Sequence, residues 1–372
     1  MTSASGNQII ETYSGITGVI LLSALLSVIF PPDGFSQPFE KDSFFYPVEE
    51  TIPFSSDLFK TNELIEVTLR FNITMFLEEK PEEEYLDAVI TWYFGSSDSV
   101  SREIRLRCRG NYRYRNCPFP PIRFNFTKSD IRDEQISSID NMKLVTHCDQ
   151  EERFTNYLLK EYLAYRIYNI VTDYSFRVRP LKIRYLDTGD KGIEQTRFAF
   201  LIEPVEMLLE RTNSTEMENV EITFEEIEKD FADRIAMFEF MIGNSDWFLP
   251  LIHNVRLVKR RDQQGAKLIP VPYDFDYSGF VNADYAIPRS ELNLETIRDR
   301  AYFGPCRYYE GYRGVLDEYI GHRKEISGLI KKFKYLEYGE RRDVKGYVDS
   351  FYSLYRKEAI IEMISINCKE TN

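Results

Sequence analysis

Hydrophobic and polar positions alternate along much of the first half of the chain. Residues 64–71 (LIEVTLRF) place an apolar side chain at every second position, as a strand with one buried face does. Residues 87–94 and 102–108 flank the polar sequence GSSDSVS, which predicts a strand–turn–strand unit. The segments PPIRFNF and NMKLVTH predict two further strands. Residues 37–150 are therefore expected to form a mainly antiparallel β region.

Helical spacing appears from residue 156 onward. Residues 156–171 have apolar side chains at intervals of three and four, which predicts a helix, and the segments FRVRPLKIRYL and TRFAFLIEP predict two strands after it. Residues 221–242 predict a second helix with an acidic start, which suits a helix N-terminus. The segments HNVRLV and KLIPVPYDF then predict a hairpin, and 313–335 and 342–366 predict two last helices. This order predicts an α+β protein with a β-rich N-terminal lobe and a mainly helical C-terminal lobe.

The N-terminal segment has the pattern of an export signal. The first forty residues contain no Lys or Arg, and Gly15 to Phe30 is an uncharged, mostly apolar run, shorter than the roughly 20 residues of a membrane-spanning helix. Small residues follow it, so we expect a signal peptide over residues 1–36 and export to the periplasm or the extracellular space, with no stable membrane span after cleavage. An uncleaved N-terminal anchor is the alternative. The expected lobes are then residues 37–204 and 205–372.

One segment of the chain carries a charge opposite to that of the whole. The chain has 47 basic and 60 acidic residues, a net charge of −13, which disfavours binding to nucleic acid. Residues 101–126 nevertheless form a basic island with a single acid, Glu103. This island is either a site for an anion such as a phosphate or a solvated hairpin face. Its arginines are Arg102, Arg105, Arg107, Arg109, Arg113, Arg115 and Arg123.

Cysteine and histidine content limits the metal chemistry. The five cysteines include no CxxC pair, so a zinc ribbon is not supported, and three histidines are too few for a histidine-rich metal site. In an exported protein, Cys108 could bond to Cys117 and Cys148 to Cys306, which would leave one cysteine unpaired within the chain.

Polar residues around the predicted hairpin supply the groups that phosphoryl transfer needs. One carboxylate must accept or orient the attacking hydroxyl, while a carboxamide and a second carboxylate hold the cations that neutralise the phosphates. Asp246, Asn254 and Asp274 follow in that order, and oxygen ligands suit Mg²⁺ or Mn²⁺. Alternatively, each is an ordinary loop residue, for example Asp246 as the cap of a turn. Asp274 and Asp276 lie in an apolar segment, IPVPYDFDYSGF, where an unpartnered carboxylate is costly.

These segments resemble the CotH-like (spore-coat protein H) family of atypical protein kinases and, more distantly, HipA-type kinases. The similar motifs are GNSDWFLPLIHNVRL, PVPYDFD, EIRLRCRGNYR with PPIRFNF, and RFAFLIEP. A KLVTHC segment also resembles a set of uncharacterised exported bacterial proteins. The first resemblance implies a protein-kinase-like bilobed fold, ATP with Mg²⁺ or Mn²⁺ as cofactors, and a protein or small-molecule hydroxyl as substrate. It implies nothing about the oligomeric state.

The resemblance also implies roles for particular residues. By position, Asp246 is the catalytic aspartate, and Asn254, Asp274 and Asp276 are the metal ligands. Residues expected at the nucleotide are Gly110, Asn111, Arg123, Lys143, Glu161 and Glu203.

The chain departs from the family pattern at the phosphate-binding residues. Arg123 stands where the family has a nucleotide-contacting lysine, and Lys143 is the nearest lysine on a strand, so either residue could contact the nucleotide. Glu161, in the helix predicted at 156–171, is the candidate ion-pair partner of the residue that contacts the nucleotide. These departures leave two alternatives to an active kinase: a degenerate pseudokinase that binds a nucleotide or a partner without turnover, and a secreted structural module whose acids bind Ca²⁺.

Overall fold

The β region closes on itself. The computed structural model describes residues 58–94, 98–126, 141–218, 222–356 and 359–370, all within one compact unit. Seven strands form a closed barrel in the order β1-β2-β3-β4-β5-β7-β6. They are β1 (Ile65–Phe71), β2 (Leu86–Phe94), β3 (Asp98–Cys108), β4 (Ile122–Phe126), β5 (Asn141–Val145), β6 (Val178–Asp187) and β7 (Glu194–Ile202). Neighbours are antiparallel, except that β6 runs parallel to β1 and so closes the barrel.

Alternating side chains fill the barrel interior. In β1 the apolar residues at every second position are buried and the polar residues between them face outward, as the sequence pattern predicted. The short helix α1 (Ile73–Glu79) adds Ile73 and Phe76 to this core. Asp187 at the end of β6 holds the start of α1, because its Oδ1 accepts hydrogen bonds from the backbone N–H groups of Ile73 and Thr74, at 2.8 and 3.2 Å.

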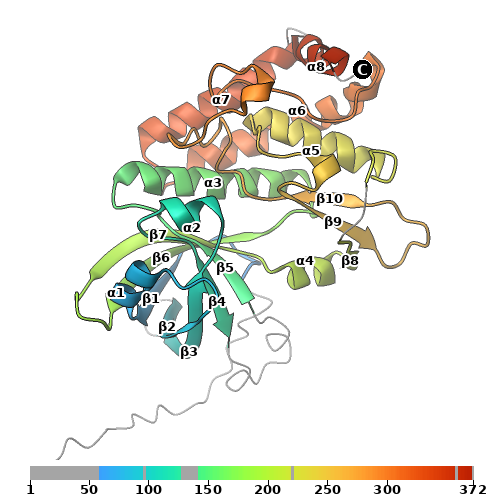
Figure 1. The fold of residues 1–372 in the computed structure, drawn as a ribbon. Coiled ribbons are helices and arrows are strands. Elements are labelled where there is room, and N and C mark those ends of the chain that lie inside the picture. Colours follow the sequence, from blue (N-terminus) through green and yellow to red (C-terminus); the bar gives the residue numbers. More distant parts are fainter. Residues whose placement is uncertain (1–57, 95–97, 127–140, 219–221, 357–358, 371–372) are drawn as a thin grey trace, which may run out of the picture. The chain divides into compact units, whose positions relative to one another are not determined.

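A second core forms around the helix α3 (Glu152–Val171), which lies between the barrel and the remaining helices (Figure 1). One side of α3 contacts β6 and β7, and the other contacts helices from the end of the chain. Most of its side chains are buried, Glu161 and Lys160 among them. The helices that complete this core are α5 (Lys229–Ile242), α6 (Tyr309–Lys332), α7 (Tyr338–Arg356) and α8 (Ala359–Glu370).

A small antiparallel sheet lies beside α5. Its order is β10-β9-β8, formed by β8 (Ser214–Glu216), β9 (Val255–Arg260) and β10 (Ile269–Pro272). The helix α4 (Val205–Arg211) connects the barrel to this sheet. The predicted hairpin is therefore confirmed as β9 and β10. The segment before β9 and the segment after β10 contain the candidate catalytic residues.

The α+β class is confirmed, whereas the predicted protein-kinase-like bilobed fold is wrong. The strands form a closed mixed barrel of seven members, and the chain after residue 204 contains a three-stranded sheet as well as helices. The alternating pattern gave the buried face of β1 correctly. It did not encode that β6 pairs with β1, more than a hundred residues earlier, and this pairing closes the barrel.

Other expectations need smaller corrections. The helix predicted at 221–242 begins only at Lys229, because Ile227 forms a β-bridge with Leu268 instead. The single helix predicted at 342–366 is two helices, α7 and α8. No helix in the described ranges is long and apolar enough to cross a membrane. The predicted signal peptide lies outside the residues that the structure describes.

Both predicted disulfides are wrong. Cys117 is bonded to Cys148, and Cys108 is a buried free thiol in β3. The reason is local: Cys108 belongs to the buried core of the barrel, while the short helix α2 (Tyr112–Asn116) brings Cys117 to the segment just after β5. Burial raises the pKa of the Cys108 thiol to about 12.

Candidate active site

The loop after α5 begins at a glycine that no other residue can replace easily. Gly243 ends the helix in the left-handed conformation, with φ at +62°, and a Cβ there would collide with the Tyr347 hydroxyl. The chain then turns away from the helix, and the Asn244 side chain accepts a hydrogen bond from the backbone N–H of Asp246 at 2.9 Å. This turn directs the Asp246 carboxylate into a cavity.

Asp246 and Asn254 are in direct contact. Asn254 Nδ2 donates to the Asp246 carbonyl oxygen at 2.6 Å and to Asp246 Oδ2 at 3.0 Å, and His253 Nε2 lies 3.2 Å from Asp246 Oδ1. Asn254 and Ile252 both have positive φ, near +55° and +52°. Such conformations cost about 1–3 kcal/mol each and persist where the surrounding structure holds them, as the hydrogen bonds to Asp246 do for Asn254. The amide of Asn254 thus fixes the orientation of the carboxylate.

Asp274 follows β10 and so lies at the same open end of the hairpin as Asn254, whose carbonyl oxygen accepts a hydrogen bond from the backbone N–H of Tyr273 at 3.0 Å. Asp274 too has a positive φ, +68°, and its backbone N–H donates to the Tyr165 hydroxyl on α3 at 2.9 Å. The carboxylate opens onto the cavity, yet the surrounding protein limits its solvation. This desolvation, together with the nearby Asp276 carboxylate, raises the pKa of Asp274 to about 6. Among the described residues nothing donates a hydrogen bond to this carboxylate.

Asp276 and Glu161 share one arginine. Arg113 Nε donates to Asp276 Oδ2 at 3.0 Å, and Arg113 Nη2 donates to Glu161 Oε2 at 2.8 Å. The Tyr285 hydroxyl also donates to Asp276 Oδ2, at 3.0 Å. Burial raises the pKa of Glu161, and the Arg113 guanidinium opposes that shift by stabilising the carboxylate. The ion-pair partner of Glu161 is therefore Arg113, not Lys143 or Arg123.

All of the predicted site residues line two adjoining cavities. The larger one, about 500 Å³, is lined by Gly110, Asn111, Lys143, Glu161, Asp246, Asn254, Asp274 and Asp276 among others. The smaller one, about 220 Å³, is lined by Arg123, Lys143 and Glu203, with Tyr273 shared between the two. Segments more than 160 residues apart in the sequence thus meet at one place.

Lys143 lies between the two cavities. It faces Arg123 directly across the β4–β5 pair, and its ammonium lies 5.4 Å from the centre of the Tyr273 ring. Burial lowers the pKa of Lys143 to about 8, and the neighbouring Arg109, Arg256 and Arg123 act in the same direction. No acid in the described part of the chain forms an ion pair with Lys143. Arg256 is paired with Glu216 at 3.3 Å, whereas Arg109 and Arg123, like Lys143, form no ion pair among the described residues. Such a cluster of cations favours an anionic ligand.

Two of the remaining predicted site residues, Gly110 and Asn111, shape the edge of the larger cavity, whereas Glu203 is paired within the protein. Gly110, with φ at +93°, turns the chain from β3 into α2, and Asn111 directly precedes that helix at the cavity edge. The Glu203 carboxylate is fully engaged, because Arg211 donates to both of its oxygens and the backbone N–H of Arg177 donates to Oε2. Its side chain therefore stabilises the junction of β7 and α4 and is not free to bind a ligand.

Sequence reasoning gave no site role to several residues that matter here. Arg113 belonged to the basic island, which was its only signal. Neither Tyr165 nor Tyr285 gave a signal in the sequence, because each contacts a site residue more than a hundred positions away. Tyr165 contacts Asp274, and Tyr285 contacts Arg113.

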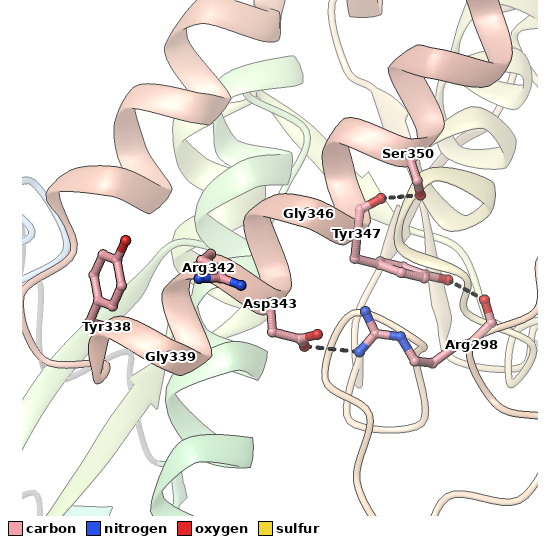
Figure 2. Close-up of a pocket in the computed structure, with 8 residues that line it drawn as sticks. All are labelled: Arg298, Tyr338, Gly339, Arg342, Asp343, Gly346, Tyr347 and Ser350. Carbon is pink, nitrogen blue, oxygen red and sulfur yellow. Dashed lines mark hydrogen bonds and ion pairs between the residues drawn. The ribbon is translucent and has the colours of Figure 1, made fainter.

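A larger cavity lies elsewhere, along α7, with a volume of about 580 Å³ (Figure 2). Its polar groups are mostly paired with one another: Arg298 forms an ion pair with Asp343 at 2.9 Å, and the Tyr347 hydroxyl donates to the Arg298 carbonyl oxygen at 3.0 Å. Gly339 and Gly346 widen it without adding chemistry. This cavity contains none of the predicted site residues, so size alone does not identify the active site.

No protein-family model matches the chain, and no curated protein is significantly similar to it. The resemblance to CotH-like kinases stays a hypothesis that rests on short motifs.

Proposed function

We propose that this protein is an exported phosphotransferase that moves a phosphoryl group from ATP to a hydroxyl of a protein or small molecule, with Mg²⁺ or Mn²⁺. The observation that supports it most is the convergence of Asp246, Asn254 and Asp274 on one cavity. Lys143, beside them, extends the site into a second, cationic cavity. Together these groups match the parts that phosphoryl transfer requires.

The residues present fit a divalent cation. Asn254 uses its Nδ2 to hold Asp246, which leaves its Oδ1 available, and the Asp274 carboxylate also has no donor among the described residues. Asp276 has only Oδ1 left, since Arg113 and Tyr285 occupy Oδ2. No cluster of three or more His, Cys, Asp or Glu side chains with metal-binding geometry occurs in the described ranges. Phosphate and water oxygens would complete the coordination, as is usual for Mg²⁺, and the cation would neutralise phosphate charge.

The smaller cavity suits the nucleoside end of ATP. Phe176, Ile202, Val205 and Tyr273 give it apolar and aromatic walls, while Lys143 stands where it meets the larger cavity. A base placed against those walls would direct its phosphates past Lys143 toward Asp274. Pockets for ligands of this size combine apolar walls with polar groups that fix the orientation of the ligand. Here the charged side chains of Arg123, Glu206 and Arg256 also line the cavity.

Asp246 is the proposed general base. Asn254 holds its Oδ2 and His253 lies against its Oδ1, yet each carboxylate oxygen has a further lone pair for the acceptor hydroxyl. About a third of the Asp246 side chain, 35%, is exposed. A carboxylate held in this way can accept the hydroxyl proton as the phosphoryl group is transferred.

The Cys117–Cys148 disulfide supports the proposed export. Disulfides persist in oxidising compartments and are rare in the cytosol. A protein purified from such a compartment would have an N-terminus near Gln37 if the predicted signal peptide is cleaved.

Replacing Asp274 with alanine is expected to abolish the stabilisation of the folded protein by ATP with Mg²⁺ or Mn²⁺. At an ATP concentration of 100 times Kd, the wild-type chain should gain about 2.7 kcal/mol of unfolding free energy. A thermal-shift series with ATP alone, metal alone and both measures this gain. Absence of any nucleotide effect in the wild type would contradict the proposal, whereas stabilisation by Ca²⁺ alone would favour a structural module.

The affinity for ATP is expected to fall roughly tenfold between pH 7 and pH 9, because Lys143 loses its charge near pH 8. Lys143→Arg should remove most of this pH dependence, since a guanidinium stays charged. Calorimetric titrations at the two pH values test both statements. The unliganded protein should show the opposite trend, since the folded state prefers the neutral amine and gains stability from pH 8 toward pH 10.5. A pH-independent affinity in the wild type would exclude Lys143 as a phosphate ligand.

A further inference from the structure

Arg113 is the one described side chain that joins three separate parts of the candidate site. Its guanidinium bonds to Glu161 of α3, to Asp276 after β10, and to the hydroxyl of Tyr285 at 3.2 Å. Only 13% of the Arg113 side chain is exposed, and the side chains of Glu161 and Asp276 are 2% and 8% exposed. The Arg113 guanidinium therefore forms buried ion pairs with both carboxylates, Glu161 and Asp276.

The segment that contains Arg113 is fixed at both ends. The backbone N–H of Arg109 donates to the Pro121 carbonyl oxygen at 3.0 Å, which closes the segment at its base. Cys117, four residues after Arg113, is bonded to Cys148, and its backbone N–H donates to the Arg113 carbonyl oxygen at 2.9 Å. The Lys80 ammonium caps the end of α2 by donating to the Cys117 carbonyl oxygen at 3.0 Å. The backbone of Arg113 is thus held independently of the carboxylates that its side chain contacts.

We propose that Arg113 is a positioning residue, which the disulfide-anchored α2 holds in place so that it fixes the segment of residues 273–277 against α3. This inference rests on the proposed function for its kinetic consequence, because Asp274 lies within that segment. Arg113 does not need to touch the substrate. It sets the direction of the Asp274 carboxylate through the neighbouring Asp276.

The chemistry of the guanidinium explains why an arginine is needed. A planar guanidinium presents donors in a fixed fork and can bond two carboxylates at once, whereas an ammonium is a single point charge. Removing it would leave Glu161 and Asp276 buried side by side without a cation, which is strongly unfavourable. The segment after β10 would then move so that Asp276 reaches water, and Asp274 would move with it.

The test uses the full chain with Arg113→Lys and Arg113→Ala, compared with Arg184→Ala. Arg184 is a matched control because its ion pair with Glu194 is exposed on the barrel and neither residue lines the two cavities. Hydrogen exchange reports the order of residues 110–117 and 273–277, and steady-state kinetics with ATP reports kcat and KM separately. Exchange does not depend on activity, so it still decides the inference if the wild type fails to turn over ATP and the proposed function falls.

Arg113→Ala is expected to speed exchange in both 110–117 and 273–277 while the strands β1 and β2 stay protected. Arg113→Lys should retain the KM for ATP within about threefold and lower kcat at least tenfold. Faster exchange confined to 110–117, with kcat per folded molecule unchanged, would overturn the inference. If Arg113→Ala speeds exchange over the whole chain, its fold is generally destabilised and Arg113→Lys becomes the deciding variant. A kcat equal to that of the wild type in Arg113→Lys would also overturn the inference.

The role of the disulfide is tested with the paired variant Cys117→Ser and Cys148→Ser. It should speed exchange in 273–277 as Arg113→Ala does, and adding Arg113→Ala should then have little further effect, because both changes remove the same link. Additive effects on 273–277 would show that α2 does not hold Arg113 in place.

Discussion

Replacing Asp246 with asparagine is expected to lower the rate of phosphoryl transfer from ATP by about 10³-fold, within the range that a general base contributes. The amide has the size of the carboxylate and can still accept a hydrogen bond from Asn254, so the loop should keep its shape. It cannot take the proton of the acceptor hydroxyl. ATP affinity should therefore remain within about threefold of the wild type, since the proposed phosphate and metal ligands are unchanged.

The measurement is transfer of labelled phosphate under single-turnover conditions, with ATP affinity measured by calorimetry. Asp284→Asn is a matched control, because Asp284 forms an exposed ion pair with Arg153 and should not affect the reaction. Equal rates in Asp246→Asn and the wild type would exclude Asp246 as the base. Tight ATP binding by the wild type with no transfer to any acceptor would favour the pseudokinase alternative.

The candidate site was largely predictable because its residues belong to short local motifs. Asp246 and Asn254 are eight residues apart in one loop, and their mutual hydrogen bonds follow from the turn between α5 and β9. Asp274 follows the partner strand of the same hairpin, so the β9–β10 pairing alone brings it near Asn254. Local sequence thus determines the centre of the site.

The connections between these motifs were not predictable. Arg113 and Asp276 are 163 residues apart, and no periodicity in either segment indicates that they meet. Barrel closure is a similar case, since alternation shows which face of β1 is buried but not that β6 lies beside it. Cysteine spacing likewise suggested a bond between Cys108 and Cys117, although the side chain of Cys108 is buried in the barrel core.

Helix starts were also misjudged where tertiary contacts replace local preference. Acidic residues before Lys229 suit a helix N-terminus, yet the backbone N–H of Glu228 donates to the Leu268 carbonyl oxygen at 2.8 Å. That contact ties the segment to the strand region before β10. The helix begins only after it, at Lys229.

Acid is expected to destabilise the protein strongly through His147, next to the Cys117–Cys148 disulfide. The imidazole is fully buried, with its ring centre 4.7 Å from that of Phe119 and 6.0 Å from that of Tyr185, and neither nitrogen has a hydrogen-bond partner among the described residues. Burial, with a smaller effect of Arg197, lowers the pKa of His147 from 6.5 to about 3. Between pH 6.5 and pH 3 the unfolded chain therefore binds a proton at His147 that the folded chain does not bind. The free energy of unfolding falls as the pH drops below 6.5 and continues to fall toward pH 3.

Between pH 7 and pH 4 this one group should remove about 3 kcal/mol of unfolding free energy. His147→Phe keeps an aromatic ring between Phe119 and Tyr185 but cannot bind a proton, so its loss over the same pH range should be smaller by that amount. Urea unfolding of both proteins at the two pH values measures the difference, with His322→Gln on α6 as a histidine control. Because only the change with pH is compared, any cost of fitting the larger ring cancels. Equal pH dependence in His147→Phe and the wild type would show that His147 is protonated in the folded protein, with its charge paired or hydrated.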